Sequence, residues 1–273
     1  MTRLHAPNTA VLPFGDALAY EALMGRWSAR LAAHFVQFCR LPGAGHVLDV
    51  GCGTGSLLAA LHQAAPALRL NGIDHDLGFV AHAQARFASS SVAVEQGDAC
   101  ALALADGTVD ATLSLLVLMA LNDPMAAALE MRRVTRPDGV VAACTWKHEG
   151  LALSQVVWEE AVRLDPAAET AMGRFRHCNQ PGQLSELWRA AGLVDVVETA
   201  IEICTPFADF DDFWLPLQQG VGPGGAYLRQ LAPAAKNTLR HALRARLLAC
   251  GSDRAFSLRA CALAVRGTVP GRG

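Results

Sequence analysis

The most informative segment of the chain is a glycine-rich turn that follows a short apolar stretch. Residues 47–56 read Val-Leu-Asp-Val-Gly-Cys-Gly-Thr-Gly-Ser, and a helix is predicted to begin at Ser56. Glycine lets the backbone adopt positive φ values, and it lets a ligand lie directly against the main chain. The N–H groups at the start of the following helix would point toward that ligand. The turn therefore predicts a site for a nucleotide-like molecule, with a tight turn that binds no ligand as the simpler alternative.

The spacing of the glycines distinguishes between kinds of nucleotide site. Glycines stand at positions 51, 53 and 55. The dinucleotide fingerprint G-x-G-x-x-G needs its third glycine at position 56, where this chain has Ser56, so NAD is disfavoured. The chain also has no G-x-x-x-x-G-K-[ST] sequence, so a phosphate-binding P-loop and ATP hydrolysis are not expected.

Two aspartates end the next two predicted strands. Asp74 stands 23 positions after Gly51, where a carboxylate could accept hydrogen bonds from both hydroxyls of a ribose. Asp98 ends the third strand, next to Ala99, near the expected adenine end of the ligand. Ligands of open α/β sheets bind outside the carboxyl ends of the strands, which is where these aspartates are expected.

The elements that must position these residues alternate between strands and helices from residue 46 to residue 146. Such alternation is typical of βαβ units and predicts a parallel sheet with helices on both faces. The strands are continuously apolar, as expected for strands that are covered on both sides. The predicted strands are His46–Val50, Arg69–Ile73, Val92–Glu95, Asp110–Leu116 and Val140–Trp146, and the predicted helices are Ser56–Ala64, Leu77–Phe87 and Pro124–Val134.

Further elements flank this core on both sides. A helix predicted over Asp16–Cys39 precedes the first strand, so it can fold over the edge of the sheet that carries the turn. A helix over Ala234–Ala249 has a basic side with Arg240 and Arg244, which we interpret as a solvated face rather than an anion-binding patch. The other predicted elements are the helices Ala152–Leu164 and Gln183–Ala191 and the strands Val194–Ile203 and Phe256–Val265.

Taken together, these motifs resemble the class I S-adenosylmethionine-dependent methyltransferases, in the small-molecule group that includes the ubiquinone and menaquinone biosynthesis enzymes. The resemblance is close over residues 46–146. It implies an α/β fold with a Rossmann-like sheet, mostly parallel with an antiparallel last strand, helices on both faces, an N-terminal lid helix and helical substrate insertions. It also implies one methyltransferase domain over residues 1–273, with lid helices at 1–42, a cofactor-binding core at 43–148, substrate-covering helices with one strand at 149–253, and a last strand and tail at 254–273.

The resemblance implies S-adenosyl-L-methionine as the cofactor and assigns residues to each part of it. The glycine loop would hold the methionine part, Asp74 the ribose, and Asp98 with Ala99 the adenine. Tyr20 and Arg26 lie in a segment that resembles a helix covering the cofactor, with simple packing as an equal alternative. The full set of implied cofactor-binding residues is Tyr20, Arg26, Asp49, Gly51, Cys52, Gly53, Gly55, Asp74, His75, Asp98, Ala99 and Leu115.

No catalytic base stands out in the sequence. Many members of the family have histidine at one or both positions that align with Met119 and Ala120, and this chain has neither. His148, His177 and Tyr20 are weak candidates for an acid–base role. A strong base is not required, because methyl transfer from a sulfonium is an in-line displacement in which orientation alone can supply as much as ~7–11 kcal/mol.

The expected acceptor is a small organic molecule. The fourth predicted strand ends in Ser114-Leu115-Leu116-Val117, with neither an (Asn/Asp)-Pro-Pro-(Tyr/Phe) sequence nor a Pro-Cys pair. This disfavours methylation of adenine or glutamine amino groups and of cytosine carbon 5. Two other classes stay open. One is a protein that binds the cofactor without turnover, and the other is a methylase of a soft atom such as arsenic, which would need convergent thiols.

Composition and charge exclude several further classes. A chain with 52% hydrophobic and 18% charged residues can bury a core, so disorder is excluded. The net charge of −2 lacks the basic footprint of nucleic-acid binders. The longest nearly apolar run, Ala111–Leu121, is shorter than the ~20 residues of a membrane span. The eight cysteines lack metal-site spacing, and residues 1–16 carry no secretory signal, so we expect no metal and a cytoplasmic protein.

Overall fold

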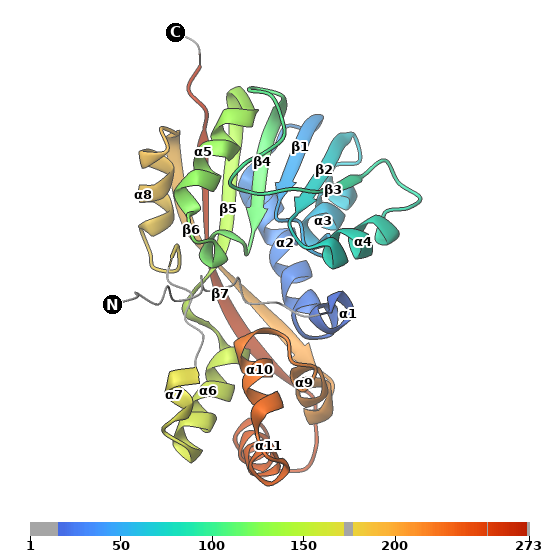
Figure 1. Ribbon diagram of the computed structural model, residues 1–273, viewed down its shortest axis with the longest axis vertical. Helices are drawn as coiled ribbons and strands as arrows, with labels where there is room; N and C mark the ends of the chain where they lie inside the picture. Colours follow the sequence, from blue (N-terminus) through green and yellow to red (C-terminus); the bar gives the residue numbers. More distant parts are fainter. Residues whose placement is uncertain (1–15, 172–176, 250, 272–273) are drawn as a thin grey trace, which may run out of the picture.

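The structure is a computed structural model, and it describes residues 16–171, 177–249 and 251–271. Strands within these residues form one seven-stranded sheet (Figure 1): β1 (Gly45–Val50), β2 (Leu68–Asp74), β3 (Ala93–Gln96), β4 (Val109–Leu115), β5 (Thr135–Leu151), β6 (Val194–Phe207) and β7 (Phe256–Thr268). Their order is β3-β2-β1-β4-β5-β7-β6. The first five pair in parallel, and β7 runs antiparallel to both of its neighbours. The predicted Rossmann-like sheet, with its antiparallel last strand, is confirmed.

The glycine-rich turn lies at the point where the strand order reverses. The chain proceeds outward from β1 through β2 to β3, and it then returns to place β4 on the other side of β1. Adjacent connections therefore leave in opposite directions at the carboxyl end of β1, which opens a crevice where open α/β sheets bind their ligands. Gly51 follows directly after the last residue of β1, so the turn occupies this crevice.

Helices cover both faces of the sheet, as expected. One face is covered by α2 (Arg26–Cys39), α3 (Ser56–Ala64) and α4 (Leu77–Arg86), and the other face by α5 (Pro124–Val134) and α8 (Gln183–Ala190). A single 3₁₀ turn (η2), at Leu118–Ala120, connects β4 toward α5. Among the described residues, no helix is both long enough and apolar enough to cross a membrane. The predicted bounds of α3, α4, α5 and α8 agree with the structure to within one residue.

The N-terminal region is helical from Ala17 to Cys39, with a π-helical stretch inside it. Helix α1 (Ala17–Tyr20) is capped by the Asp16 carboxylate, which accepts a hydrogen bond from the backbone N–H of Leu18 at 2.6 Å. A π-helical turn, η1 (Glu21–Gly25), then connects α1 to α2. Within α2 the side chains of Trp27, Leu31 and Phe35 are completely buried. Helix α2 is therefore part of the core of the protein, whereas α1 and η1 are short additions at its N-terminal end.

Three strands extend beyond their predicted ends. In β5 the pairing with β4 shifts from Thr135 to Val140, so residues 136–139 form a bulge at which Asp138 has φ 61°. This bulge contains the Pro-Asp-Gly sequence that is typical of a turn. The apolar pattern therefore starts the strand at Val140, whereas in the structure the strand continues through the bulge from Thr135. Strands β6 and β7 pair with each other over their whole lengths as far as Phe207 and Phe256. These long strands carry the sheet into a second group of helices.

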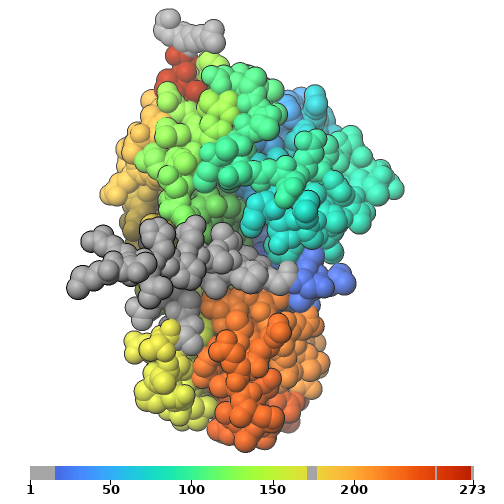
Figure 2. Space-filling view, viewed as in Figure 1, coloured from blue at the N-terminus to red at the C-terminus, as the bar shows by residue number. Residues whose placement is uncertain are grey.

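This second group forms a lower lobe around the far ends of β6 and β7 (Figure 1). Its helices, yellow and orange, gather apart from the blue and green sheet lobe (Figure 2). The members are α6 (Ala152–Leu164), α7 (Ala168–Ala171), α9 (Phe210–Leu217), α10 (Gly222–Gln230) and α11 (Pro233–Leu248). Its core is aromatic: the Phe207 and Phe256 rings stack with centroids 5.2 Å apart, and Phe210, Phe213 and Trp214 are buried beside them.

The basic face of α11 is neutralised within the lower lobe. Arg240 donates to Asp211 at 2.9 Å, and Arg244 donates to Asp253 at 2.7 Å. Arg246 likewise pairs with Glu160 at 3.2 Å. These arginines therefore serve intramolecular ion pairs, which agrees with the interpretation that the face is not an anion-binding patch.

The burial of α2 leads to a prediction about stability. Trp27→Ala removes a fully buried indole that lies 6.2 Å, between ring centroids, from Phe207. We expect it to lower the free energy of unfolding by about 3–5 kcal/mol, because a large side chain leaves a cavity. Leu18→Ala, nine residues earlier at a 69% exposed side chain, is the control and should change it by less than about 0.5 kcal/mol. Urea denaturation measures both, and equal effects would contradict the assignment of α2 to the core.

Candidate functional site

The three glycines of the turn adopt positive φ angles, but for different reasons. Gly51, Gly53 and Gly55 have φ values of 75°, 53° and 86°. A Cβ atom on Gly51 would lie 2.5 Å from Val117 Cγ2, and one on Gly55 would lie 2.7 Å from Phe87 Cε2, so these two are required by packing. A Cβ on Gly53 would meet no heavy atom of the described residues within 4 Å. Gly53 therefore faces open space, as a glycine that admits a ligand should.

The turn is fixed to the end of β2 by hydrogen bonds. The backbone N–H groups of Gly51 and Cys52 both donate to the carbonyl oxygen of Ile73 at 2.8 Å. The N–H of Gly53 donates to Asp74 Oδ2 at 2.8 Å, and Asp74 Oδ1 accepts from the N–H of Asp76 at 2.9 Å. The buried carboxylate of Asp74 thus holds the turn, and an ionised carboxylate with about four acceptor sites still has capacity for other donors.

Asp49 lies under the turn, and its carboxylate is isolated. Its side chain is 1% exposed, and neither of its oxygens has a hydrogen-bond partner among the described residues. Burial raises the pKa of this carboxyl well above its usual value, and the negative charge of Asp74 raises it further. Buried polar atoms normally have partners, so an isolated carboxylate at the bottom of a cavity points to a cationic ligand.

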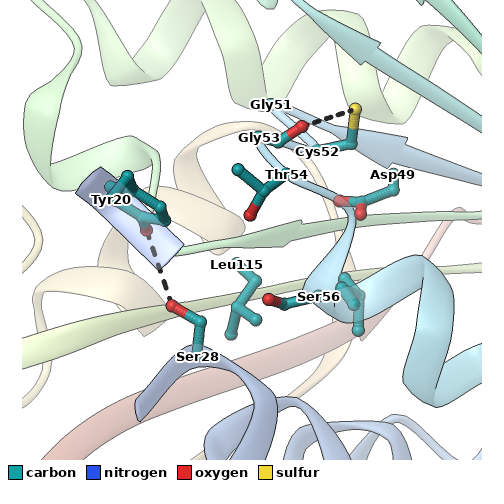
Figure 3. Close-up of a pocket in the computed structure, with 10 residues that line it drawn as sticks. Tyr20, Ser28, Asp49, Gly51, Cys52, Gly53, Thr54, Ser56 and Leu115 are labelled. Atoms are coloured by element: carbon teal, nitrogen blue, oxygen red, sulfur yellow. Dashed lines mark hydrogen bonds between the residues drawn. The ribbon is translucent and has the colours of Figure 1, made fainter. Parts of the chain in front are cut away.

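These residues surround a small cavity, and Tyr20 and Ser28 of the N-terminal region line one side of it (Figure 3). Its volume is about 40 Å³. The Tyr20 hydroxyl lies 3.5 Å from Ser28 Oγ, and the Tyr20 ring lies 5.2 Å, between centroids, from Phe79. Burial raises the pKa of the Tyr20 phenol. The cavity is lined by Tyr20, Ser28, Asp49, Gly51, Cys52, Gly53, Thr54, Ser56, Leu57 and Leu115, so six of the twelve predicted cofactor-binding residues meet here.

Arg26 lies apart from this cavity. Its guanidinium donates two hydrogen bonds to Asp212 at 2.9 and 2.6 Å, and one to the carbonyl oxygen of Pro206 at 3.3 Å. It also stands 5.0 Å from the centre of the Phe207 ring, and its pairing with Asp212 raises its pKa. The structure thus separates Arg26 from Tyr20, with which it was predicted to cover the cofactor, because a partner 186 residues later in the chain holds it.

The residues predicted for the adenine end lie along the same edge of the sheet, closer to the surface. The His75 side chain is 66% exposed, and its Nδ1 is 3.4 Å from Asp74 Oδ1. Asp98 is exposed, and its Oδ1 accepts from the N–H of Cys100 at 2.8 Å. Ala99 beside it is buried. Gly55, at the end of the turn, supports the site through packing and does not line the cavity.

Of the three candidates for an acid–base role, Tyr20 alone lines the cavity. The His148 ring is half exposed and stands 3.7 Å from Glu149. His177 lies in a separate groove of about 310 Å³, beside Met125 of α5 and Leu187 of α8. Neither histidine lines the cavity at the glycine-rich turn.

The thiols do not converge at the site. Cys52 lines the cavity, and burial raises its pKa, so it stays a neutral thiol. In the parts of the chain that the structure describes, no three histidine, cysteine or acidic side chains are arranged to hold a metal ion. The arrangement offers no support for a methylase of arsenic or another soft atom.

Four polar residues at the site, Glu21, Ser28, Thr54 and Ser56, are not among those predicted from the sequence. Thr54 Oγ1 donates a hydrogen bond to the Glu21 carboxylate, which joins η1 to the glycine-rich turn. Ser28 lines the cavity next to Tyr20. Gly25 leaves room for the Glu21 side chain, because an added Cβ would lie 2.5 Å from Glu21 Oε2.

The state of Asp49 can be tested by its effect on stability. Because its pKa is raised on folding, the folded protein holds a proton that the unfolded chain loses, and stability falls as the pH rises above about 4. Asp49→Asn lacks this titration, so we expect it to be more stable than the original protein by about 1–3 kcal/mol at pH 8 and by less at pH 5. Asp195→Asn, at an exposed position in β6, is the control. Urea denaturation curves that keep the same separation at both pH values would contradict this.

Comparisons with known proteins agree on one family. Residues 48–143 match the family model described as a methyltransferase domain. The chain is 34% identical over 98 residues to a ubiquinone/menaquinone biosynthesis C-methyltransferase of Desulfotalea psychrophila, which covers 36% of this chain and 40% of that protein. It is 31% identical over 167 residues to a demethylmenaquinone methyltransferase of Roseiflexus castenholzii, which covers 57% of this chain and 70% of that protein.

A solved structure shows the same fold. Phosphoethanolamine N-methyltransferase 2 of Haemonchus contortus, in complex with phosphomonomethylethanolamine and S-adenosylhomocysteine, aligns with a TM-score of 0.58 and 17% identity over 93% of this chain and 57% of that chain. The glycine-rich turn at the strand switch point, the family match over the core and the relative from Roseiflexus lead to one conclusion. The chain belongs to the family of S-adenosylmethionine-dependent methyltransferases, whose cofactor is S-adenosylmethionine.

Proposed function

We propose that this chain transfers the methyl group of S-adenosylmethionine to a small organic acceptor. The observation that supports this most strongly is the Asp49 carboxylate, buried beneath the glycine-rich turn with no hydrogen-bond partner among the residues described. S-adenosylmethionine carries an ammonium group and a sulfonium, so it can supply the positively charged partner that the Asp49 carboxylate does not have among the described residues. The open space at Gly53 gives the main chain room to contact it.

In the proposed complex each part of the cofactor has protein groups to hold it. Asp49 would pair with the ammonium of the methionine part, and Leu115 at the end of β4 would lie against the same part. Asp74 would accept from the ribose hydroxyls with the acceptor capacity that Gly53 and Asp76 leave. Asp98, Ala99 and the exposed His75 ring would meet the adenine.

S-adenosylmethionine supplies an electrophilic methyl group when it is bound. The chain's contribution is orientation and the exclusion of water, which suits a site without a general base among its lining residues. The raised pKa of Tyr20 keeps its phenol protonated at neutral pH. Tyr20 can therefore orient an acceptor by donating a hydrogen bond, and it is not suited to removing a proton.

The proposed acceptor is small because the site is closed in by protein on several sides. Tyr20 and Ser28 come from the N-terminal region, and Leu57 and Leu115 come from the sheet lobe. Two of the similar proteins are named for methylation in quinone biosynthesis, which favours an organic acceptor of that size class. The division into lid, core, substrate-covering helices and last strand is part of the same proposal.

Binding at the turn can be tested by adding a side chain at Gly53. We expect Gly53→Val to abolish the heat of S-adenosylmethionine binding in calorimetric titration, because the side chain occupies the open space beside the main chain. Gly182→Val is the matched control, since Gly182 also has positive φ, at 91°, and no described heavy atom near its Cβ position. Each change costs about 1–2 kcal/mol of backbone strain. Normal binding by Gly53→Val would refute the placement of the cofactor.

Turnover distinguishes an enzyme from a protein that binds the cofactor without using it. We expect metabolites from a strain that lacks this protein to gain one methyl mass when they are incubated with the protein and S-adenosylmethionine, with an equal amount of S-adenosylhomocysteine formed. Mass spectrometry measures both. Tight binding without any S-adenosylhomocysteine would favour the alternative without turnover, and the Gly53→Val variant supplies the background rate.

A further inference from the structure

The chain makes an unusual turn where β4 ends, beside the cavity at the glycine-rich turn. Leu116, the residue that follows β4, has φ 65°. Positive φ values are unfavourable for residues other than glycine, and asparagine and aspartate tolerate them best. Among the described non-glycine residues with positive φ, Leu116 is the only one with a large apolar side chain. Such strain persists only where neighbouring contacts impose it, and it is concentrated at functional sites.

Hydrogen bonds and packing hold the chain on both sides of Leu116. The Leu116 N–H donates to the carbonyl oxygen of Cys144 on β5 at 2.7 Å, which continues the strand pairing one residue past β4. On the other side, the carbonyl oxygen of Val117 accepts from the N–H of Ala120 at 2.8 Å, and Leu118 is completely buried. The chain must therefore leave the sheet and enter η2 almost at once, and the positive φ of Leu116 makes this change of direction.

This change of direction brings Val117 against the glycine-rich turn. A Cβ on Gly51 would lie 2.5 Å from Val117 Cγ2 and 2.8 Å from Val117 Cγ1, so the Val117 side chain fills the space beside Gly51. A second contact joins the same two strand ends, because the buried Ser114 hydroxyl donates to the carbonyl oxygen of Val50 at 2.9 Å. Since β4 and β2 lie on opposite sides of β1, the end of β4 supports the turn from the side that β2 does not reach.

We propose that Leu116 is a positioning residue for the cofactor site. Its positive φ places Val117 against Gly51 and Leu115 along the cavity (Figure 3), and this keeps the glycine-rich turn in the conformation that binds S-adenosylmethionine. The inference rests on the proposed function. Leu116 itself does not line the cavity, so it acts through its two neighbours. The backbone conformation at position 116 is what the site requires, rather than the size of the side chain.

Leu116→Ile and Leu116→Met separate the backbone conformation from the size of the side chain. Isoleucine is an isomer of leucine, but its branched Cβ makes a positive φ much less favourable. Methionine is unbranched at Cβ and similar in volume, so it is the matched control. Arg40→Ile places the same branched side chain at another positive φ, 52°, at the exposed end of α2, and it controls for strain alone. Val117→Ala removes the contact with Gly51 and leaves Leu116 unchanged.

Hydrogen exchange of the amides of residues 51–53, measured by mass spectrometry on the full chain without ligand, tests whether Leu116 holds the turn. These amides donate to Ile73 and Asp74, so their exchange reports how often the turn opens. We expect several-fold faster exchange in Leu116→Ile and Val117→Ala than in the original protein, Leu116→Met or Arg40→Ile. Unchanged exchange in either of the first two would overturn the proposal, and Val117→Ala alone decides if Leu116→Ile does not fold.

Calorimetric titration with S-adenosylhomocysteine tests the effect on the site. We expect binding about tenfold weaker in Leu116→Ile and Val117→Ala, because only a fraction of their molecules has the turn in its binding conformation. Leu116→Met and Arg40→Ile should bind like the original protein. Equal affinities in all of these proteins would overturn the role of Leu116 and leave the proposed function intact. Faster exchange in variants of a protein that does not bind S-adenosylhomocysteine would support the positioning of the turn and overturn the proposed function.

Discussion

The site depends on a carboxylate that the sheet places where water and hydrogen-bond donors are excluded. Asp49 belongs to β1, which has a strand on either side and helices over both faces, so its side chain is removed from solvent. Without a partner among the described residues, its ionised form is costly, and the proximity of Asp74 increases the cost. A cationic ligand would relieve both effects. The isolation of Asp49 therefore lowers the stability of the folded protein, and it makes the site suited to binding a positively charged group.

The surrounding structure serves to keep this carboxylate both buried and accessible. The glycine-rich turn passes over it with backbone angles that leave open space at Gly53, and hydrogen bonds to Ile73 and Asp74 hold the turn in position. Helix α2 is anchored by Trp27 in the core and by the bidentate pair of Arg26 with Asp212 of α9. That pair ties the N-terminal end of α2 to the lower lobe.

Much of the architecture could be predicted because its signals are local. Strands buried on both faces are apolar throughout, and the glycine spacing, with acids at the ends of β2 and β3, identifies both the crevice and the class of ligand. Helices α9 and α10 could not be predicted, since Pro216 and the Gly-Pro-Gly-Gly sequence at residues 222–225 are unfavourable for helix formation. Packing of side chains such as Phe213 and Trp214 overrides those preferences.

The interactions that sequence reasoning did not predict connect residues that are distant in the chain. The sequence left Arg26 between a contact with the cofactor and simple packing, and its partner Asp212 follows 186 positions later. The bond between Thr54 and Glu21 spans 33 positions and joins two segments whose own patterns contain no reference to each other. A helical pattern also does not reveal the π-helical turn that places Tyr20 over the cavity.

The central claim, that Asp49 receives the positive charge of the cofactor, is tested most directly by the protons released on binding. Calorimetric titration of S-adenosylmethionine at neutral pH, in buffers that differ in ionisation enthalpy, measures this number. Since burial raises the pKa of Asp49 and a bound cation would lower it, we expect more proton release from the original protein than from Asp49→Asn. Binding without proton release, or with the same release in Asp49→Asn, would contradict the claim.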